Sequence, residues 1–76
     1  MKARLINNPK ITGNTSRFNV ASLAEVIMYF DDGSADSMFP SDIEILINEE
    51  WVPLDIAFKD ELVEISDDNT IFHERK

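Results

Sequence analysis

The chain has no cysteine, and its 76 residues include only two glycines, three prolines and one histidine. Without cysteine there is no disulfide scaffold, no cysteine-based zinc site and no thiol nucleophile. No apolar run approaches the roughly 20 residues that a membrane helix requires. Residues 1–9 also lack the apolar stretch of a signal peptide. We therefore expect a cytoplasmic protein that does not associate with a membrane.

The residues that common enzyme chemistry requires are scarce as well. Gly13 and Gly33 are far apart, so the chain has no glycine-rich phosphate loop. His73 has no neighbour in the sequence that would orient it as a general base. An EF-hand loop with Gly33 at its sixth position would begin at Met28, which is not a calcium ligand. The sequence therefore predicts a protein that is not an enzyme and needs no metal and no cofactor.

Basic residues are few, and the charge is unevenly distributed. Fifteen acidic and seven basic residues give a formal net charge of −8. Residues 1–20 carry four basic residues and no acid, whereas residues 21–74 carry all fifteen acids and only Lys59. This balance argues against direct nucleic-acid binding, which depends on cation–phosphate contacts. Two interpretations stay open: the basic segment folds against the acidic body, or the body presents an acidic surface to a basic partner.

What the sequence does contain is mostly a pattern of strands. Residues 24–30 are β-branched and aromatic, and Asp31-Asp32-Gly33 follows them. Asp-Gly after such a run favours a tight hairpin in which both central residues have positive φ. The returning strand would comprise residues 34–39. Alternating or β-branched patterns predict three more strands, over residues 2–6, 43–47 and 51–54.

The remaining segments are more polar. Residues 10–17 are rich in turn formers, which predicts an exposed loop. Residues 55–65 fit a short helix with Asp55 as its N-cap, although 62–65 also fit a strand. Pro53 places the strand before it at an edge or at its own end. We expect a single small β-rich domain over residues 1–65 and a polar, frayed tail over residues 66–76.

The hairpin and the segment after it carry a family resemblance. Residues 24–33, followed five residues later by Phe39-Pro40-Ser41-Asp42-Ile43, resemble the middle of small SH3-like barrels of the Tudor type. The resemblance covers residues 24–46 and implies a mainly β fold. That fold is a small SH3-like barrel, or a strongly bent antiparallel sheet of five to six strands, with one short C-terminal helix.

The same resemblance implies a site. Tudor-type readers hold methylated lysine or arginine in an aromatic cage. Tyr29 and Phe39 lie near positions that contribute to such a cage, but the strand before the hairpin offers only Phe18. We therefore carry over the architecture and not the ligand. Trp51 is expected in the core or, if partly exposed, at an interface.

Three functions remain open. The first is a non-catalytic, acidic module that docks onto a larger protein with a basic surface. The second is an acidic inhibitor of phage or mobile-element origin that mimics nucleic acid and blocks a host enzyme; one continuous stripe of acids would favour it. The third is an assembly protein that forms a homodimer by pairing edge strands. The candidate partner-binding residues are Tyr29, Asp31, Asp32, Asp36, Phe39, Asp42, Glu44, Glu49, Glu50 and Trp51.

Overall fold

The computed structural model describes all 76 residues, and its fold is mainly β. An antiparallel six-stranded sheet has the order β4-β3-β2-β1-β5-β6, and β7 and β8 form a second, two-stranded sheet. The six strands are β1 (Lys2–Leu5), β2 (Thr12–Asn19), β3 (Ser22–Phe30), β4 (Ala35–Met38), β5 (Ile43–Ile47) and β6 (Glu50–Pro53). A 3₁₀ turn, η1 (Pro40–Asp42), connects β4 to β5. The strand β6 lies at a sheet edge and ends at Pro53, as predicted.

The prediction of an exposed loop over residues 10–17 is wrong, because β2 occupies most of that segment. The first two buried positions of β2, Gly13 and Thr15, carry residues small enough to fit. A Cβ atom at Gly13 would collide with the carbonyl oxygen of Tyr29. Thr15 is buried, and its hydroxyl donates a hydrogen bond to the carbonyl oxygen of Ile27 at 2.8 Å. Pairing with β1 on one side and β3 on the other gives this polar segment the backbone hydrogen bonds that hold it as a strand.

The β3–β4 hairpin forms where it was predicted, but its turn is longer than expected. The Gly33 amide donates to the carbonyl oxygen of Phe30, and the Phe30 amide donates to that of Ser34. Of the turn residues, only Gly33 has a positive φ, of 94°. This geometry corresponds to a three-residue loop that ends in a left-handed residue. The two-residue turn with positive φ at both positions is therefore a wrong prediction.

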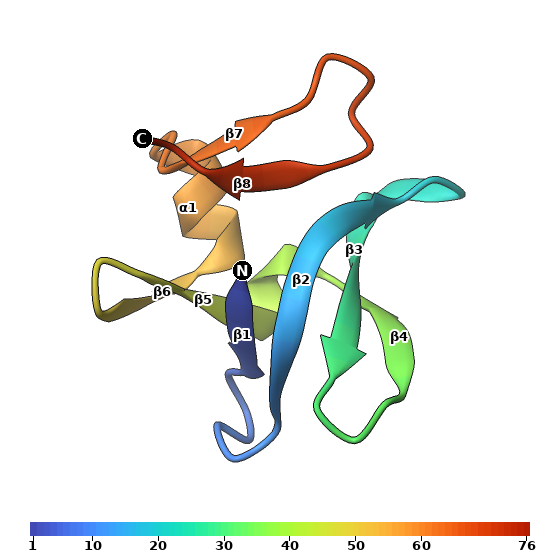
Figure 1. Cartoon of the computed structure of the whole chain (residues 1–76), viewed down its shortest axis with the longest axis vertical. Coiled ribbons are helices and arrows are strands. Elements are labelled where there is room, and N and C mark those ends of the chain that lie inside the picture. The colour runs from blue at the N-terminus through green and yellow to red at the C-terminus, as the bar shows by residue number, and fades with distance from the viewer.

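The six-stranded sheet is strongly bent. Figure 1 shows β5 and β6 running across the direction of β2 and β3. The pairing of β2 with β3 is irregular between Thr15 and Arg17 and again between Phe18 and Asn19, and such bulges bend a strand and increase its twist. The sheet does not close into a barrel, so the strongly bent sheet is the form of the prediction that the structure supports.

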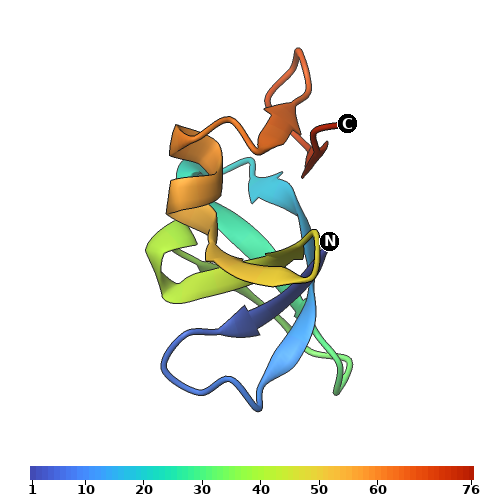
Figure 2. The same ribbon diagram turned by 90° about the vertical axis from the view of Figure 1, so that its left-hand side faces the viewer.

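The C-terminal segment contains both structures that residues 55–65 suggested. The helix α1 (Leu54–Lys59) is followed by β7 (Val63–Ile65) and β8 (Phe72–Glu74). Pro53, and not Asp55, is the N-cap of α1; the Asp55 carboxylate instead accepts a hydrogen bond from the amide of Ile56. In Figure 2, α1 stands between β6 and the β7–β8 hairpin.

The expectation of a frayed tail over residues 66–76 does not hold, because Phe72 is part of the core. Its exposed fraction is 1%, and its ring centroid lies 5.2 Å from that of Phe18 and 5.3 Å from that of Phe58. The three rings come from β8, β2 and α1, so they join the C-terminal hairpin to the main sheet. Two apolar residues, Ile71 and Phe72, in a polar stretch are too weak a signal to predict this attachment.

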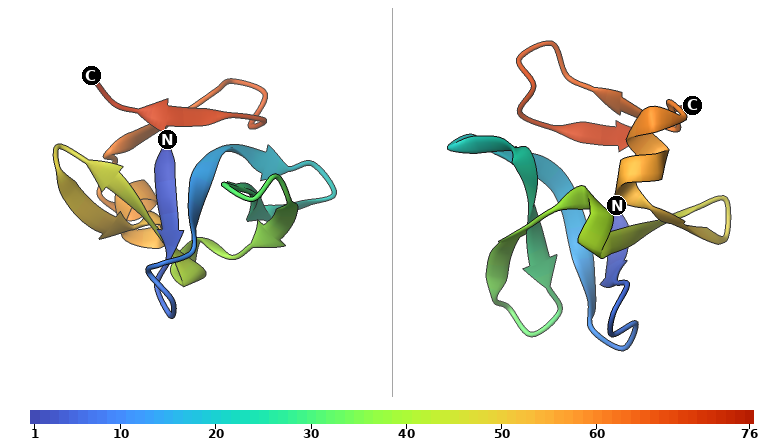
Figure 3. Two further views of the ribbon diagram at one scale, coloured as in Figure 1. Left: turned by 60° about the horizontal axis from the view of Figure 1, so that its bottom comes forward. Right: turned by 180° about the vertical axis from the view of Figure 1, so that it is seen from behind.

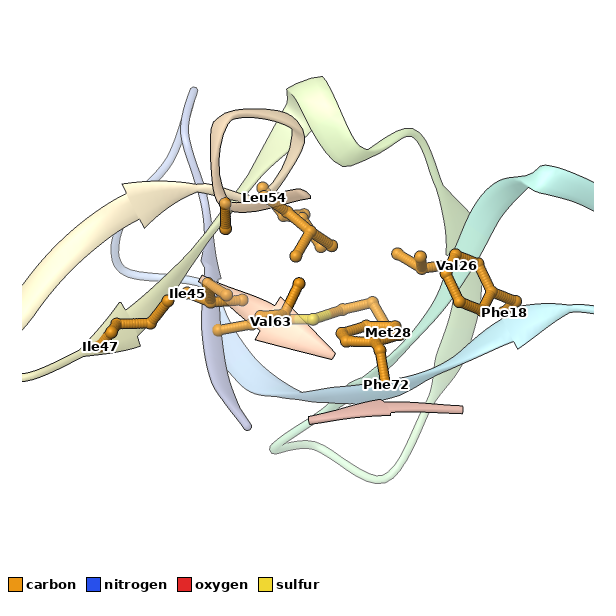
Figure 4. Packing of buried hydrophobic residues seen from close by; sticks show 11 residues of the cluster. Phe18, Val26, Met28, Ile45, Ile47, Leu54, Val63 and Phe72 are labelled. Atoms are coloured by element: carbon orange, nitrogen blue, oxygen red, sulfur yellow. The ribbon is translucent and has the colours of Figure 1, made fainter. Parts of the chain in front are cut away.

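The hydrophobic core runs through the inside of the bent sheet. In Figure 4, Ile47 lies at one end of the cluster, and Phe18 and Val26 lie at the other. The core consists of eleven buried residues: Ala3, Phe18, Val26, Met28, Ile43, Ile45, Ile47, Leu54, Ala57, Val63 and Phe72. No buried side-chain nitrogen or oxygen lacks a hydrogen-bond partner. The outward residues of the same strands are therefore the ones available for function.

Candidate functional site

The ten predicted site residues fall into three groups. The first group belongs to the β3–β4 hairpin and the second to the β5–β6 hairpin. The third group lies at η1, where Phe39 precedes the turn and Asp42 is its last residue. The strands β4 and β6 are the two edges of the six-stranded sheet. The first and second groups therefore lie on opposite sides of the molecule, as Figure 1 shows.

Two acidic residues line an open hollow at the β3–β4 turn. The hollow has a volume of about 300 Å³ and is lined by Lys10, Ile11, Thr12, Phe30, Asp31 and Asp32. We call it the acidic hollow. The Asp31 carboxylate accepts a hydrogen bond from the hydroxyl of Thr12. That contact joins the β3–β4 turn to β2, so the position of this carboxylate is fixed by two elements.

Asp32 is held in place by the turn itself. Its Oδ1 accepts hydrogen bonds from the hydroxyl of Ser34 at 2.6 Å and from the amide of Ser34 at 2.8 Å. Both hydrogen bonds lower the pKa of Asp32 below its ordinary value of 3.8, and the one from the Ser34 hydroxyl has the larger effect. The group is therefore anionic at neutral pH, which suits it to bind a cation and not to supply a proton.

Tyr29 and Phe39 do not form an aromatic cage. Tyr29 pairs with Ala35 at the start of β4, whereas Phe39 follows Met38 at its end. Phe39 is four residues of extended chain beyond Ala35, the partner of Tyr29. At roughly 3.3 Å per residue, this places Phe39 about 13 Å along the strand from Tyr29. Both side chains are exposed, Tyr29 at 45% and Phe39 at 55%. Phe18, the aromatic residue of the strand before the hairpin, is buried in the core.

Trp51 is half-buried on the outward face of β5 and β6. The guanidinium carbon of Arg4 lies 4.1 Å from the centroid of the Trp51 ring. The Nε atom of the same arginine donates to Oε1 of Glu44 at 2.7 Å. Strand pairing produces this cluster, because Arg4 is opposite Glu44 and Trp51 is opposite Leu46. Glu44 is thus neutralised within the protein and is not free to bind a partner.

Arg4 contacts two of the predicted site residues, although the sequence alone did not identify it. Alternation in β1 places it outward, between the inward residues Ala3 and Leu5. Its stacking on Trp51 depends on the register of β1 against β5, and no local pattern reveals that register. Arg4 also provides one direct contact between the basic N-terminal segment and the acidic body.

The other acids are spread over the corners of the molecule. Glu49 and Glu50 lie at the β5–β6 turn, where Glu49 has a φ of 67°. Asp60 and Glu61 follow α1, and residues 67–68 lie in the β7–β8 loop. In Figure 1 these corners and the β3–β4 turn are separate from one another. The ion pairs of the structure engage only Glu44 and Glu64 among the fifteen carboxylates.

A second hollow, which the sequence did not suggest, lies between two hairpins. It has a volume of about 190 Å³ and is lined by Phe18, Leu23, Ile65 and Asn69. We call it the apolar hollow. Figure 3 shows the β7–β8 loop beside the β2–β3 turn in both of its views. Because Phe18 and Ile65 are far apart in the sequence, only the attachment of the C-terminal hairpin brings these residues together.

His73 has a partner after all, although it is exposed. Its Nε2 lies 3.6 Å from Oε2 of Glu64 across the β7–β8 pair, and Arg75 lies 3.4 Å from the other oxygen of that carboxylate. No three histidine or acidic side chains converge in a group able to hold a metal ion. No helix combines the length and the apolar character needed to cross a bilayer.

Comparison with known proteins gives no relative: no family model, no curated protein and no solved structure matches the chain.

Proposed function

We propose that this protein is a non-catalytic binding module that docks onto a protein with a basic surface. The observation that supports this proposal is the acidic hollow. Its carboxylates are held by Thr12 and Ser34, and none of Asp31, Asp32 and Asp36 belongs to an ion pair within the chain. Asp31, Asp32 and Lys10 line the hollow and give it a net charge of −1, whereas Asp36 lies in the return strand β4.

The chemistry around the acidic hollow supports recognition more than catalysis. Ile11 and Phe30 provide apolar surface beside the carboxylates, and exposed Tyr29 precedes Phe30 in β3. A lysine or arginine side chain of a partner would lay its aliphatic stem on the apolar residues and its charge against Asp31 and Asp32. A carboxylate with a lowered pKa is a poor proton donor at neutral pH, which weighs against acid catalysis by Asp32.

The other two functions have less support. A nucleic-acid mimic needs carboxylates along a continuous track, whereas the acid pairs here lie at separate corners. Assembly by edge pairing would use β4, since β6 ends in Pro53, which cannot donate a hydrogen bond. The strand β4 has only four residues, and short edge strands are poor templates for pairing.

We also propose that the architecture is SH3-like. The features that support it are the long strand β3, the short return strand β4 and the turn η1, which carries Asp42 ahead of Ile43. Amide hydrogen exchange tests whether the sheet closes in solution. Protected amides along the outer sides of β4 and β6 would support closure, and rapid exchange there would argue against it.

The proposed function is tested with two charge-matched double variants. Proteins that the immobilised chain captures at low salt are identified, and their affinities are measured by calorimetry. Asp31→Asn/Asp36→Asn removes one charge that lines the acidic hollow and one from the return strand of the same hairpin, and Glu49→Gln/Glu50→Gln removes two at the opposite edge. An exposed ion pair with the partner contributes about 0.5 kcal/mol to binding. The loss of two such pairs predicts roughly a fivefold loss of affinity for the first variant. The second should stay close to wild type.

The salt dependence gives an independent readout. Binding through exposed charges weakens as ionic strength rises, because salt screens them. Equal losses in the two variants, or an affinity that does not change with salt, would contradict docking at the acidic hollow. A concentration-dependent dimer in sedimentation, abolished by a proline in β4, would favour assembly by edge pairing.

A further inference from the structure

Exposed apolar side chains gather around the apolar hollow. Leu23 is 57% exposed and Ile65 is 47% exposed, and both line it. Val20, in the adjacent β2–β3 turn, is the most exposed large hydrophobic residue of the chain, at 76%. Single exposed apolar residues are ordinary, but a concentration of them around a hollow marks an interaction site.

The walls of the hollow are fixed by contacts on both sides. Phe18 stacks on Phe58 with ring centroids 5.5 Å apart, and it also packs against Phe72. The amide of Phe18 donates to the carbonyl oxygen of Thr70 at 3.0 Å, which ties the β7–β8 loop to β2. Within that loop, Asp68 accepts hydrogen bonds from the hydroxyls of Ser66 and Thr70, each at 2.7 Å. A binding surface that is formed in advance loses little conformational entropy when it is occupied.

Acidic residues lie within two sequence positions of Leu23 and Asn69, and no basic residue lines the hollow. Asp67 and Asp68 directly precede Asn69, and Glu25 lies two residues beyond Leu23 in β3. The nearest cation in the sequence is Arg17, which pairs with Ile27 and Ile71. Because Arg17 adjoins Phe18 in β2, alternation directs it to the opposite face of the strand. A second copy seated by twofold symmetry would bring the acids of both loops together, so the charge favours a partner that is basic.

We propose that the apolar hollow anchors one large apolar side chain of a partner protein, flanked in that partner by lysine or arginine. This inference rests on the proposed function, since it takes the same class of basic partner and assigns it a second contact. The apolar side chain packs on Phe18, Leu23 and Ile65, and the flanking cations face the β7–β8 loop.

A peptide titration of the full chain, followed by NMR amide shifts, tests the anchor without knowledge of the partner. The probes are the capped tripeptides Lys-Phe-Lys, Glu-Phe-Glu and Lys-Ala-Lys. Lys-Phe-Lys should give saturable shifts at Leu23, Ile65 and Asn69, and each of the other two should bind at least several-fold more weakly. Leu23→Ser should weaken Lys-Phe-Lys by about tenfold, since much of a leucine side chain is lost from the contact.

Ile6→Ser is the matched control, because Ile6 is an exposed apolar residue that lines neither hollow. It should leave the titration unchanged, and the amide spectra of both variants report whether the fold is intact. Shifts confined to other residues, or equal binding of Lys-Phe-Lys and Glu-Phe-Glu, would overturn the inference. So would shifts at the hollow that follow protein concentration alone, which indicate a second copy. If the tripeptide fails while Asp31→Asn/Asp36→Asn still weakens partner binding, only the anchor is refuted.

Discussion

Single residues of this chain have roles that their residue type alone does not reveal. The two glycines illustrate this. Gly33 serves a conformational purpose, since its φ of 94° is one that side chains with a Cβ rarely adopt, and the space around it is open. Gly13 serves a steric purpose: its φ is not positive, but the backbone of β3 passes so close that no Cβ fits. Arg4 likewise matters for where its charge is placed, because the guanidinium contacts the Trp51 ring and pairs with Glu44.

We expect Gly13→Ala to be among the most damaging single-methyl changes in the chain. The new Cβ would meet the backbone of Tyr29 and Phe30 within 3 Å, and neither can move without separating β2 from β3. Overpacking of this kind costs about 3 kcal/mol of the free energy of unfolding. Urea unfolding measures the loss. Gly33→Asn is the comparison, with an expected cost of about 1 kcal/mol because asparagine tolerates a left-handed conformation. A Gly13→Ala variant as stable as the wild type would mean that β2 does not pack this closely.

At the scale of elements, the chain shows which strands can be predicted from local pattern. The local pattern predicts β3 because Val26, Ile27 and Tyr29 are strand-forming residues and lie on both faces of the strand. The strand β2 was missed because its small polar residues are strand formers only when β1 and β3 lie on both sides of it. The strand β8 was missed for a related reason: Phe72 is buried by Phe18, a residue 54 positions away.

The candidate site was predictable to a similar extent. Exposed acids and aromatics could be named from composition and turn chemistry, and the structure places Asp31 and Asp32 beside one hollow. It separates Tyr29 from Phe39 and neutralises Glu44, because those outcomes depend on strand register. The apolar hollow had no sequence signal, since its walls come from β2, β3 and the C-terminal hairpin.

The aromatic trio predicts how the C-terminal hairpin contributes to stability. Phe72→Ala removes a buried ring that contacts Phe18 and Phe58, which should lower the free energy of unfolding by about 3–5 kcal/mol. A domain has only about 5–15 kcal/mol to lose, so the variant should unfold at a much lower urea concentration than the wild type. Ile71→Ala, at the exposed neighbouring position, should cost less than about 1 kcal/mol. Similar urea midpoints for the two variants would show that the hairpin is not attached through Phe72.

At the scale of the whole molecule, the charge of −8 is distributed over several corners of a small bent sheet. The basic N-terminal segment does not form a separate arm, because β1 lies inside the sheet between β2 and β5. Arg4 is the only residue of that segment in an ion pair. Most carboxylates are therefore fixed by local hydrogen bonds or are unpaired, and the protein retains a strong negative field at neutral pH.

Two of those locally fixed carboxylates should make the fold sensitive to acid. Asp32 and Asp68 accept hydrogen bonds from serine and threonine hydroxyls and amides, which lower their pKa values below 3.8 in the folded protein. The unfolded chain takes up these two protons first, so their contribution to stability is present above pH 3.8 and is lost as the pH falls through the folded pKa values. Thermal melting should therefore show a drop in Tm as the pH falls below 3.8. The double variant Asp32→Asn/Asp68→Asn should show a smaller drop, and Glu49→Gln/Glu50→Gln should behave as the wild type. If the first variant loses as much Tm as the wild type, the two hydrogen-bonded turns do not carry the acid response.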